Sequence, residues 1–180
     1  MNQVSAIVFY NHIDGKQSHY LTRPRAVYVS SVGANSNLLL GIMPDNTGSV
    51  HADQLALTRE LGDWIRRCFG PAAYLSNKTG TSVSIELDFP TPVLVDRVIL
   101  QEDQSQGARV LAYDIQLHPP GGYTRQLISG GAGQAVGNKR IHFFPNGPIP
   151  LLSLIVTATQ IAPGFTDVAW KNVAALGPCV

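Results

Sequence analysis

The chain has 180 residues, enough for one domain or one and a half, and a net charge of +1. Hydrophobic residues make up 44% of it and charged residues 14%, a balance that excludes an intrinsically disordered protein. The near-neutral charge gives no electrostatic basis for binding nucleic acid or an anionic membrane. No apolar run approaches the ~20 residues of a membrane span, and residues 1–16 lack the pattern of a signal peptide. We therefore expect no nucleic-acid or membrane partner, and the localisation is unknown.

The N-terminal part contains one clear strand–helix unit. Residues 4–10 are compatible with a strand, and residues 26–32 with the end of a helix. Residues 37–43 form a short apolar run that Pro44 and Gly48 close, which predicts a strand buried on both faces. A buried strand that leads into a helix is the repeat unit of an α/β barrel.

The helix after this strand is predicted over residues 52–69 and ends at Gly70-Pro71. Its apolar residues recur at spacings of three and four and define one apolar stripe: Leu57, Leu61, Trp64, Ile65 and Cys68. We expect this stripe to pack on the strand at residues 38–42 or on an edge of the following domain, or to drive self-association.

The remainder of the chain has the pattern of a mainly β protein. Residues 72–81 are expected to be a linker. Seven short strands follow, separated by turn signals: 82–89, 94–100, 112–117, 123–128, 139–144, 151–159 and 168–176. This spacing is typical of an antiparallel β-sandwich. The predicted domains are a remnant of an α/β barrel (1–71), the linker and a C-terminal β-sandwich module (82–180).

Two series of motifs carry a resemblance to a known family. The first is Ser31-Val32-Gly33, Asn37 to Ile42, Pro44-Asp45 and Gly48; the second is Gln101-Glu102-Asp103, Gly107, Arg109-Val110, Gly137 and Lys139-Arg140-Ile141. In this order they resemble the end of the catalytic barrel and the C-terminal β-sandwich of the α-L-fucosidase family of glycoside hydrolases. Gly41 and Met43 depart from the family pattern, which usually has Asn and Pro there.

The resemblance implies a galactose-binding-like (discoidin-like) sandwich and a parent activity, the hydrolysis of α-L-fucosyl linkages in glycans. A retaining glycosidase needs two carboxylates about 5–5.5 Å apart, and the family's nucleophile lies on an earlier barrel strand. Asp45 is expected to be a turn residue. We therefore predict no catalytic residue in this chain and no turnover by the chain alone. The alternative is a free-standing carbohydrate- or protein-binding sandwich.

If the sandwich binds a fucosylated or galactosylated glycan, three residues are candidates for the site. Tyr123 follows a Gly121-Gly122 turn and could stack on a sugar ring. Glu102 and Arg109 bracket a loop and could read hydroxyl groups, although an ion pair that pins the loop is the favoured interpretation. Trp170 alternates with apolar neighbours and is predicted to be a core residue.

Other patterns predict no metal or cofactor. The histidines are scattered, without metal-ligand spacing, and the Gly-rich residues 129–133 precede a strand rather than the helix of a phosphate loop. Cys68 and Cys179 can form one bridge or remain free, and free thiols are predicted. Asn77-Lys78-Thr79 is an N-glycosylation sequon, which is meaningful if the protein is secreted. The resemblance implies a secreted or lysosomal protein, since members of that family usually are.

Overall fold

The computed structural model describes residues 6–8, 22–42, 44, 46–128 and 135–179. The chain divides into two compact units, Met1–Gly70 and Pro71–Val180, which are described separately below. The interpretations of Asp45 and of the Gly-rich residues 129–133 fall outside the described residues.

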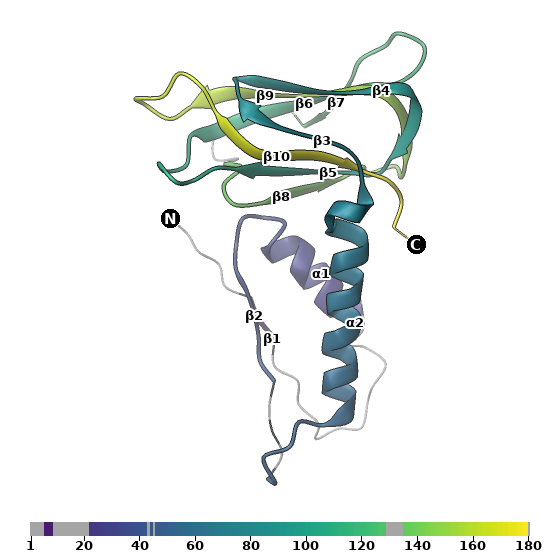
Figure 1. Cartoon of the computed structure of the whole chain (residues 1–180), viewed down its shortest axis with the longest axis vertical. Helices are drawn as coiled ribbons and strands as arrows, with labels where there is room; N and C mark the ends of the chain where they lie inside the picture. Colours follow the sequence, from purple (N-terminus) through teal and green to yellow (C-terminus); the bar gives the residue numbers. More distant parts are fainter. Residues whose placement is uncertain (1–5, 9–21, 43, 45, 129–134, 180) are drawn as a thin grey trace. The chain divides into compact units, whose positions relative to one another are not determined.

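The first unit has the order β-α-β-α (Figure 1). Strands β1 (Ala6–Val8) and β2 (Leu38–Leu40) pair in parallel, and helix α1 (Thr22–Ser31) lies between them in the sequence. Parallel neighbours need such a crossover connection, because a tight turn reverses the chain direction. Helix α2 (Ala52–Phe69) follows β2. The unit therefore contains the strand and the following helix that the sequence predicts at residues 37–43 and 52–69.

Strand β2 differs from the prediction in its burial. Leu39 is 60% exposed and Ile42 is 41% exposed, so the strand is not buried on both faces. The sheet has only two strands among the described residues. The apolar run predicts a strand covered on both faces, but a two-stranded sheet cannot cover it.

Helix α2 has well-defined ends. At its start the His51 side chain accepts a hydrogen bond from the backbone N–H of Asp53, at 3.3 Å. At its end the N–H of Gly70 donates to the carbonyl of Arg66, at 3.0 Å. A Cβ atom at position 70 would collide with that carbonyl, so glycine is required there.

Trp64, one residue of the apolar stripe of α2, contacts helix α1, which is not among the partners predicted for the stripe. The Trp64 ring makes an edge-to-face contact with Tyr28 of α1, with centroids 6.0 Å apart, and another with Phe69, at 5.1 Å. Arg25 of α1 lies over the Trp64 ring, 5.5 Å from its centroid, and pairs with Glu60 at 2.7 Å. The four buried residues of the helix are Gln54, Leu61, Cys68 and Phe69.

The prediction of free cysteines is wrong. Cys68 and Cys179 are both disulfide-bonded, and the described part of the chain contains no free thiol. Two cysteines in 180 residues are too few to be recognised as a disulfide framework, so only the three-dimensional structure reveals the bond.

The second unit is a sandwich of two four-stranded antiparallel sheets (Figure 1). One sheet has the order β3-β10-β5-β8 and the other the order β4-β9-β6-β7. The strands are β3 (Tyr74–Thr81), β4 (Ser84–Val95), β5 (Arg97–Glu102), β6 (Val110–His118), β7 (Arg125–Ile128), β8 (Arg140–Phe143), β9 (Ile149–Ile161) and β10 (Ala169–Leu176). The predicted mainly β, antiparallel fold is confirmed.

Residues 74–81 are strand β3 rather than the predicted linker. This strand lies at the edge of its sheet, and β10 is its one pairing partner among the described strands. Most of its side chains are exposed, so it lacks the apolar alternation by which strands are recognised. The break expected between the strands predicted at 82–89 and 94–100 is instead an irregularity within β4, where the pairing with β9 shifts between Asp88 and Val93.

The core of the sandwich lies between the two sheets. Its fully buried side chains come from the alternating positions of both: Leu87, Val98, Leu100, Ile115, Leu117, Leu154, Val156 and Val173. Trp170 is 2% exposed, and its Nε1–H donates to the carbonyl of Ser82 at 2.9 Å, which confirms it as a core residue. Among the described residues, no helix combines the length and the apolar character needed to cross a membrane.

Candidate functional site

Glu102 stands at the end of β5 and is 1% exposed. Its Oε1 accepts hydrogen bonds from the backbone N–H of Arg109 and from that of Val110, the latter at 3.1 Å. Its Oε2 has no hydrogen-bond partner among the described residues. Burial raises the pKa of Glu102, and backbone hydrogen bonds from Arg109, Val110 and Gly137, together with the charge of Arg109, oppose this rise. Glu102 therefore closes the loop through buried hydrogen bonds to its backbone, and the predicted ion pair with Arg109 is wrong.

Arg109 is held by partners other than Glu102. Its Nη1 pairs with Asp167 at 2.9 Å, and its Nη2 donates to Gln106 Oε1 at 3.0 Å. The guanidinium lies over the ring of Phe165, 4.7 Å from the centroid. With its side chain 12% exposed, Arg109 ties two loops together and has little surface left for a ligand.

Tyr123 is exposed, as predicted, at 59%. It lies in the β6–β7 connection, where Gly121 and Gly122 both have positive φ. The nine residues of β6 separate this connection from Arg109, which at about 3.3 Å per residue is roughly 27 Å. The structure therefore does not bring Tyr123 together with Glu102 and Arg109, and the three residues do not form one site.

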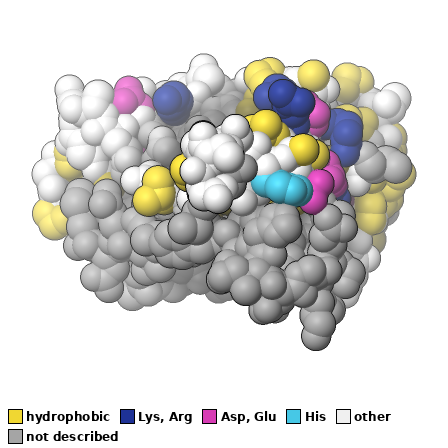
Figure 2. Space-filling model, turned by 90° about the horizontal axis from the view of Figure 1, so that it is seen from below, with side chains coloured by type: hydrophobic (Ala, Val, Ile, Leu, Met, Phe, Trp, Pro, Cys, Tyr) yellow, Lys and Arg dark blue, Asp and Glu magenta, His cyan; other side chains and the backbone are white. Residues whose placement is uncertain are grey.

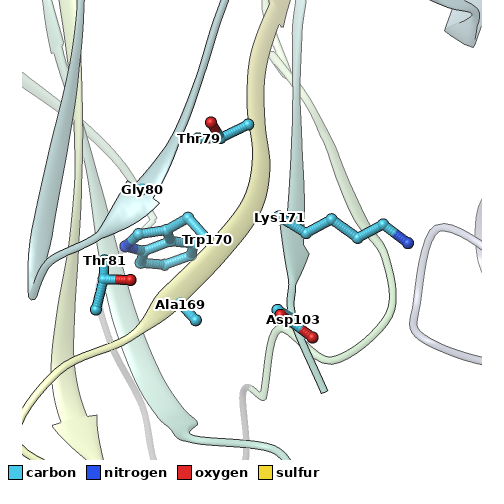
Figure 3. A pocket seen from close by; sticks show the side chains of 7 residues that line it. All are labelled: Thr79, Gly80, Thr81, Asp103, Ala169, Trp170 and Lys171. Atoms are coloured by element: carbon cyan, nitrogen blue, oxygen red, sulfur yellow. The ribbon is translucent and has the colours of Figure 1, made fainter. Parts of the chain in front are cut away.

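A hollow of about 370 Å³ lies beside the buried Glu102 loop. Figure 3 shows the side chains around it, which come from β3, β10 and the end of β5: Thr79, Gly80, Thr81, Asp103, Ala169, Trp170 and Lys171. Strand register brings them together, because Trp170 pairs with Gly80 on one side and with Glu102 on the other. We call this hollow the β3–β10 hollow.

The β3–β10 hollow carries one charge of each sign and two hydroxyl groups. Asp103 Oδ1 accepts the backbone N–H of Ser105 at 2.9 Å. This bond is the main reason that the pKa of Asp103 is lowered, and the charges of Arg109 and Lys171 contribute less. The carboxylate is therefore ionised at neutral pH. Together with the Lys171 ammonium and the hydroxyls of the two threonines, it can hydrogen-bond a polyhydroxylated ligand.

Sequence reasoning missed this hollow for a physical reason. Its residues come from three strands that are distant in the chain, and only the register of β3, β10 and β5 places them side by side.

No group of three His, Cys, Asp or Glu side chains suited to a metal ion occurs among the described residues. On the described part of one face of the molecule, basic side chains lie next to acidic ones (Figure 2).

Comparison with solved structures identifies similar proteins. A Bacteroides thetaiotaomicron protein named as a candidate α-L-fucosidase is 27% identical, with a TM-score of 0.79 over 89% of this chain and 35% of its own. A glycoside hydrolase 29 family member from an unknown rumen bacterium is 24% identical, with a TM-score of 0.76 over 96% of this chain and 31% of its own. A Ruminococcus gnavus glycoside hydrolase 29 fucosidase, solved in complex with fucose, is 18% identical and has a TM-score of 0.73 over 88% of this chain and 37% of its own.

No protein-family model and no curated protein matches the chain. The chain spans about a third of the length of the solved structures described above. The match nevertheless covers most of this chain, from the β-α-β-α unit through the sandwich, and one of the matched structures also shares 27% of its residues. The resemblance to the α-L-fucosidase family of glycoside hydrolases is therefore confirmed, for the part of those proteins that this chain spans.

Proposed function

We propose that this chain is the C-terminal portion of an α-L-fucosidase-like glycoside hydrolase, made of the end of the catalytic barrel and an accessory sandwich. The observation that carries the proposal is the order of its parts. A parallel β-α-β-α unit comes first and a two-sheet antiparallel sandwich follows. The same order of sequence motifs produced the family resemblance, and the 27% identity to one candidate fucosidase supports it.

The parent activity would be the retaining hydrolysis of α-L-fucosyl linkages, which requires a nucleophilic carboxylate and an acid/base carboxylate. The barrel strands that carry such groups at their C-terminal ends are only partly represented by β1 and β2. The role proposed for this chain is therefore to complete and support a catalytic barrel rather than to perform the chemistry alone.

We expect the purified chain to release no chromophore from an aryl α-L-fucoside. The companion variant is Asp45→Asn, because Asp45 is the carboxylate that follows the strand β2 in the sequence. Turnover by the chain that disappears in Asp45→Asn would show that the chain contains its own catalytic group. The gene supplies a second test, since an in-frame upstream barrel with an aspartate nucleophile would support the proposal.

The alternative is a free-standing module that binds carbohydrate or protein. The β3–β10 hollow favours the carbohydrate version, because its carboxylate, ammonium and hydroxyls are open to a ligand. A monosaccharide on such an open site gains little beyond the cost of its immobilisation, so its affinity would be weak. Self-association through the first unit also stays a prediction; exposed apolar residues there are Leu39, Ile42 and Leu55.

Titration with galactose and fucose, followed by amide chemical shifts, tests the carbohydrate version. We expect shifts at Thr79, Thr81 and Lys171 that approach saturation only in the millimolar range, and their loss in Lys171→Ala. Tyr123→Ala is the control, because its ring lies outside the hollow. Shifts at Tyr123 instead would place the site on the β6–β7 connection. An unchanged spectrum at high sugar concentration would leave only the accessory role.

A further inference from the structure

We propose that Asn77 carries an N-linked glycan and that the protein matures in an oxidising secretory compartment. The inference begins with Asn77-Lys78-Thr79, the single Asn-x-Ser/Thr sequence of the chain. A sequon alone is a weak signal, because many are never modified. The structure adds three observations: the accessibility of the acceptor, its place in the sheet and the state of the cysteines.

The acceptor amide is accessible. Asn77 and Thr79 are both exposed on β3, and residues two apart on a strand share one face. The intervening Lys78 is directed to β4, where its Nζ lies 3.3 Å from Asp88 Oδ2. Asn77 Nδ2 donates one hydrogen to Asn172 Oδ1 over 3.4 Å, a long and weak bond. A secondary amide formed by glycosylation would still have one N–H to donate.

The position of β3 gives the glycan room and a physical role. The strand is at the edge of the sheet β3-β10-β5-β8, so within the described part of the chain its other side has no strand neighbour in that sheet. Exposed edge strands invite pairing with other chains, and proteins protect them by charges, bulges or coverage. A bulky, hydrated glycan on Asn77 would cover the middle of this eight-residue edge.

The cysteines point independently to the same compartment. Both Cys68 and Cys179 are disulfide-bonded. Stable disulfides are typical of secreted proteins and rare in the reducing cytosol. The endoplasmic reticulum is one compartment in which disulfides form, and it is also the one in which sequons are modified. The bond and the exposed sequon are therefore two separate features that both fit maturation there.

The modification is a group transfer from a lipid-linked oligosaccharyl pyrophosphate. The Asn77 Nδ2 atom forms a bond to the anomeric carbon of the first sugar and loses one proton. The bond between that carbon and the pyrophosphate oxygen breaks, and the lipid pyrophosphate leaves. No oxidant or reductant is needed for this step, and Thr79 supplies the hydroxyl that the sequon requires.

The test is expression of the full chain behind a cleavable secretory leader in a eukaryotic cell line. We expect treatment with peptide-N-glycosidase to increase the electrophoretic mobility of the chain in a single step. Mass spectrometry should then find the enzymatic Asn77→Asp conversion. Asn77→Gln and Thr79→Ala should abolish the mobility change, whereas Thr79→Ser should retain it.

Glycosylation is scored in cell lysate as well as in the medium, because transfer precedes secretion. Thr79→Ala keeps Asn77 and its bond to Asn172, so it remains informative if Asn77→Gln does not fold. Thiol titration of the unmodified protein checks that the cysteines are oxidised. A disulfide-bonded chain without glycan in both fractions would overturn the proposal, and so would a mobility change that survives both variants. Neither result bears on fucosidase activity.

Discussion

Replacing Glu102 with alanine should lower the free energy of unfolding of the sandwich by about 3–5 kcal/mol, because hydrogen bonds to a charged group are worth ~1.5–3 kcal/mol each. The Glu102 carboxylate accepts two of them, from the backbone amides of Arg109 and Val110. The Val110 bond is buried, so alanine would leave a donor without a partner. Urea unfolding at neutral pH, followed by tryptophan fluorescence, measures the loss.

Glu102→Gln is the matched control, because its amide oxygen can take the place of Oε1. We expect a smaller loss, about 1 kcal/mol, since one buried charge disappears together with the stronger bonds. The pH dependence of the free energy of unfolding also distinguishes the wild type from Glu102→Gln. Burial raises the pKa of Glu102 in the folded state, so its protonation on lowering the pH stabilises the native protein. If Glu102→Gln lost as much stability as Glu102→Ala, the role of Glu102 as a hydrogen-bond acceptor for the loop backbone would be contradicted.

The fold was predictable wherever the sequence repeats a local pattern. Val83, Ile85, Leu87 and Phe89 alternate with polar residues, and this alternation correctly predicts the first half of β4. Helix α2 is likewise evident from its stripe and from the Gly70-Pro71 stop. These signals depend on neighbours within one element, so a single sequence contains them.

Features that depend on pairing between distant segments were not predictable. Edge strand β3 has no apolar alternation, and only its register with β10 reveals it. Glu102 was expected to pair with the side chain of Arg109, but its carboxylate binds the backbone instead. The spacing of the two residues shows that a loop is closed between them. It does not show whether the bond runs to a guanidinium or to an amide.

Acidification should destabilise the sandwich through His142. Its Nε2 lies 2.6 Å from the hydroxyl of Tyr113, so strand β8 of one sheet is joined to strand β6 of the other. Burial lowers the pKa of His142 to about 4, and the charge of Arg140 adds to this effect. Burial also raises the pKa of Tyr113 to about 12. At neutral pH the imidazole is therefore neutral, and the phenol keeps its proton to donate.

Between pH 6.5, the ordinary pKa of histidine, and about 4, the His142 imidazole is protonated in the unfolded state but remains neutral in the folded state. The stability due to neutral His142 is complete above this range and is lost as the pH falls through it. At 1.36 kcal/mol per pKa unit the loss is about 3 kcal/mol. Urea midpoints at intervals between pH 7 and 4 measure it.

His142→Gln supplies the comparison, since its amide oxygen can accept the Tyr113 hydroxyl and does not titrate. The carboxylates contribute equally to both proteins, so the difference between their unfolding free energies isolates the histidine. We expect this difference to favour the wild type less and less as the pH falls from 6.5 to 4. Tyr113→Phe should keep the wild-type pH dependence, because it removes the hydrogen bond but leaves the imidazole in the same half-buried position. A constant difference between wild type and His142→Gln would mean that His142 is protonated as readily in the folded protein as in water.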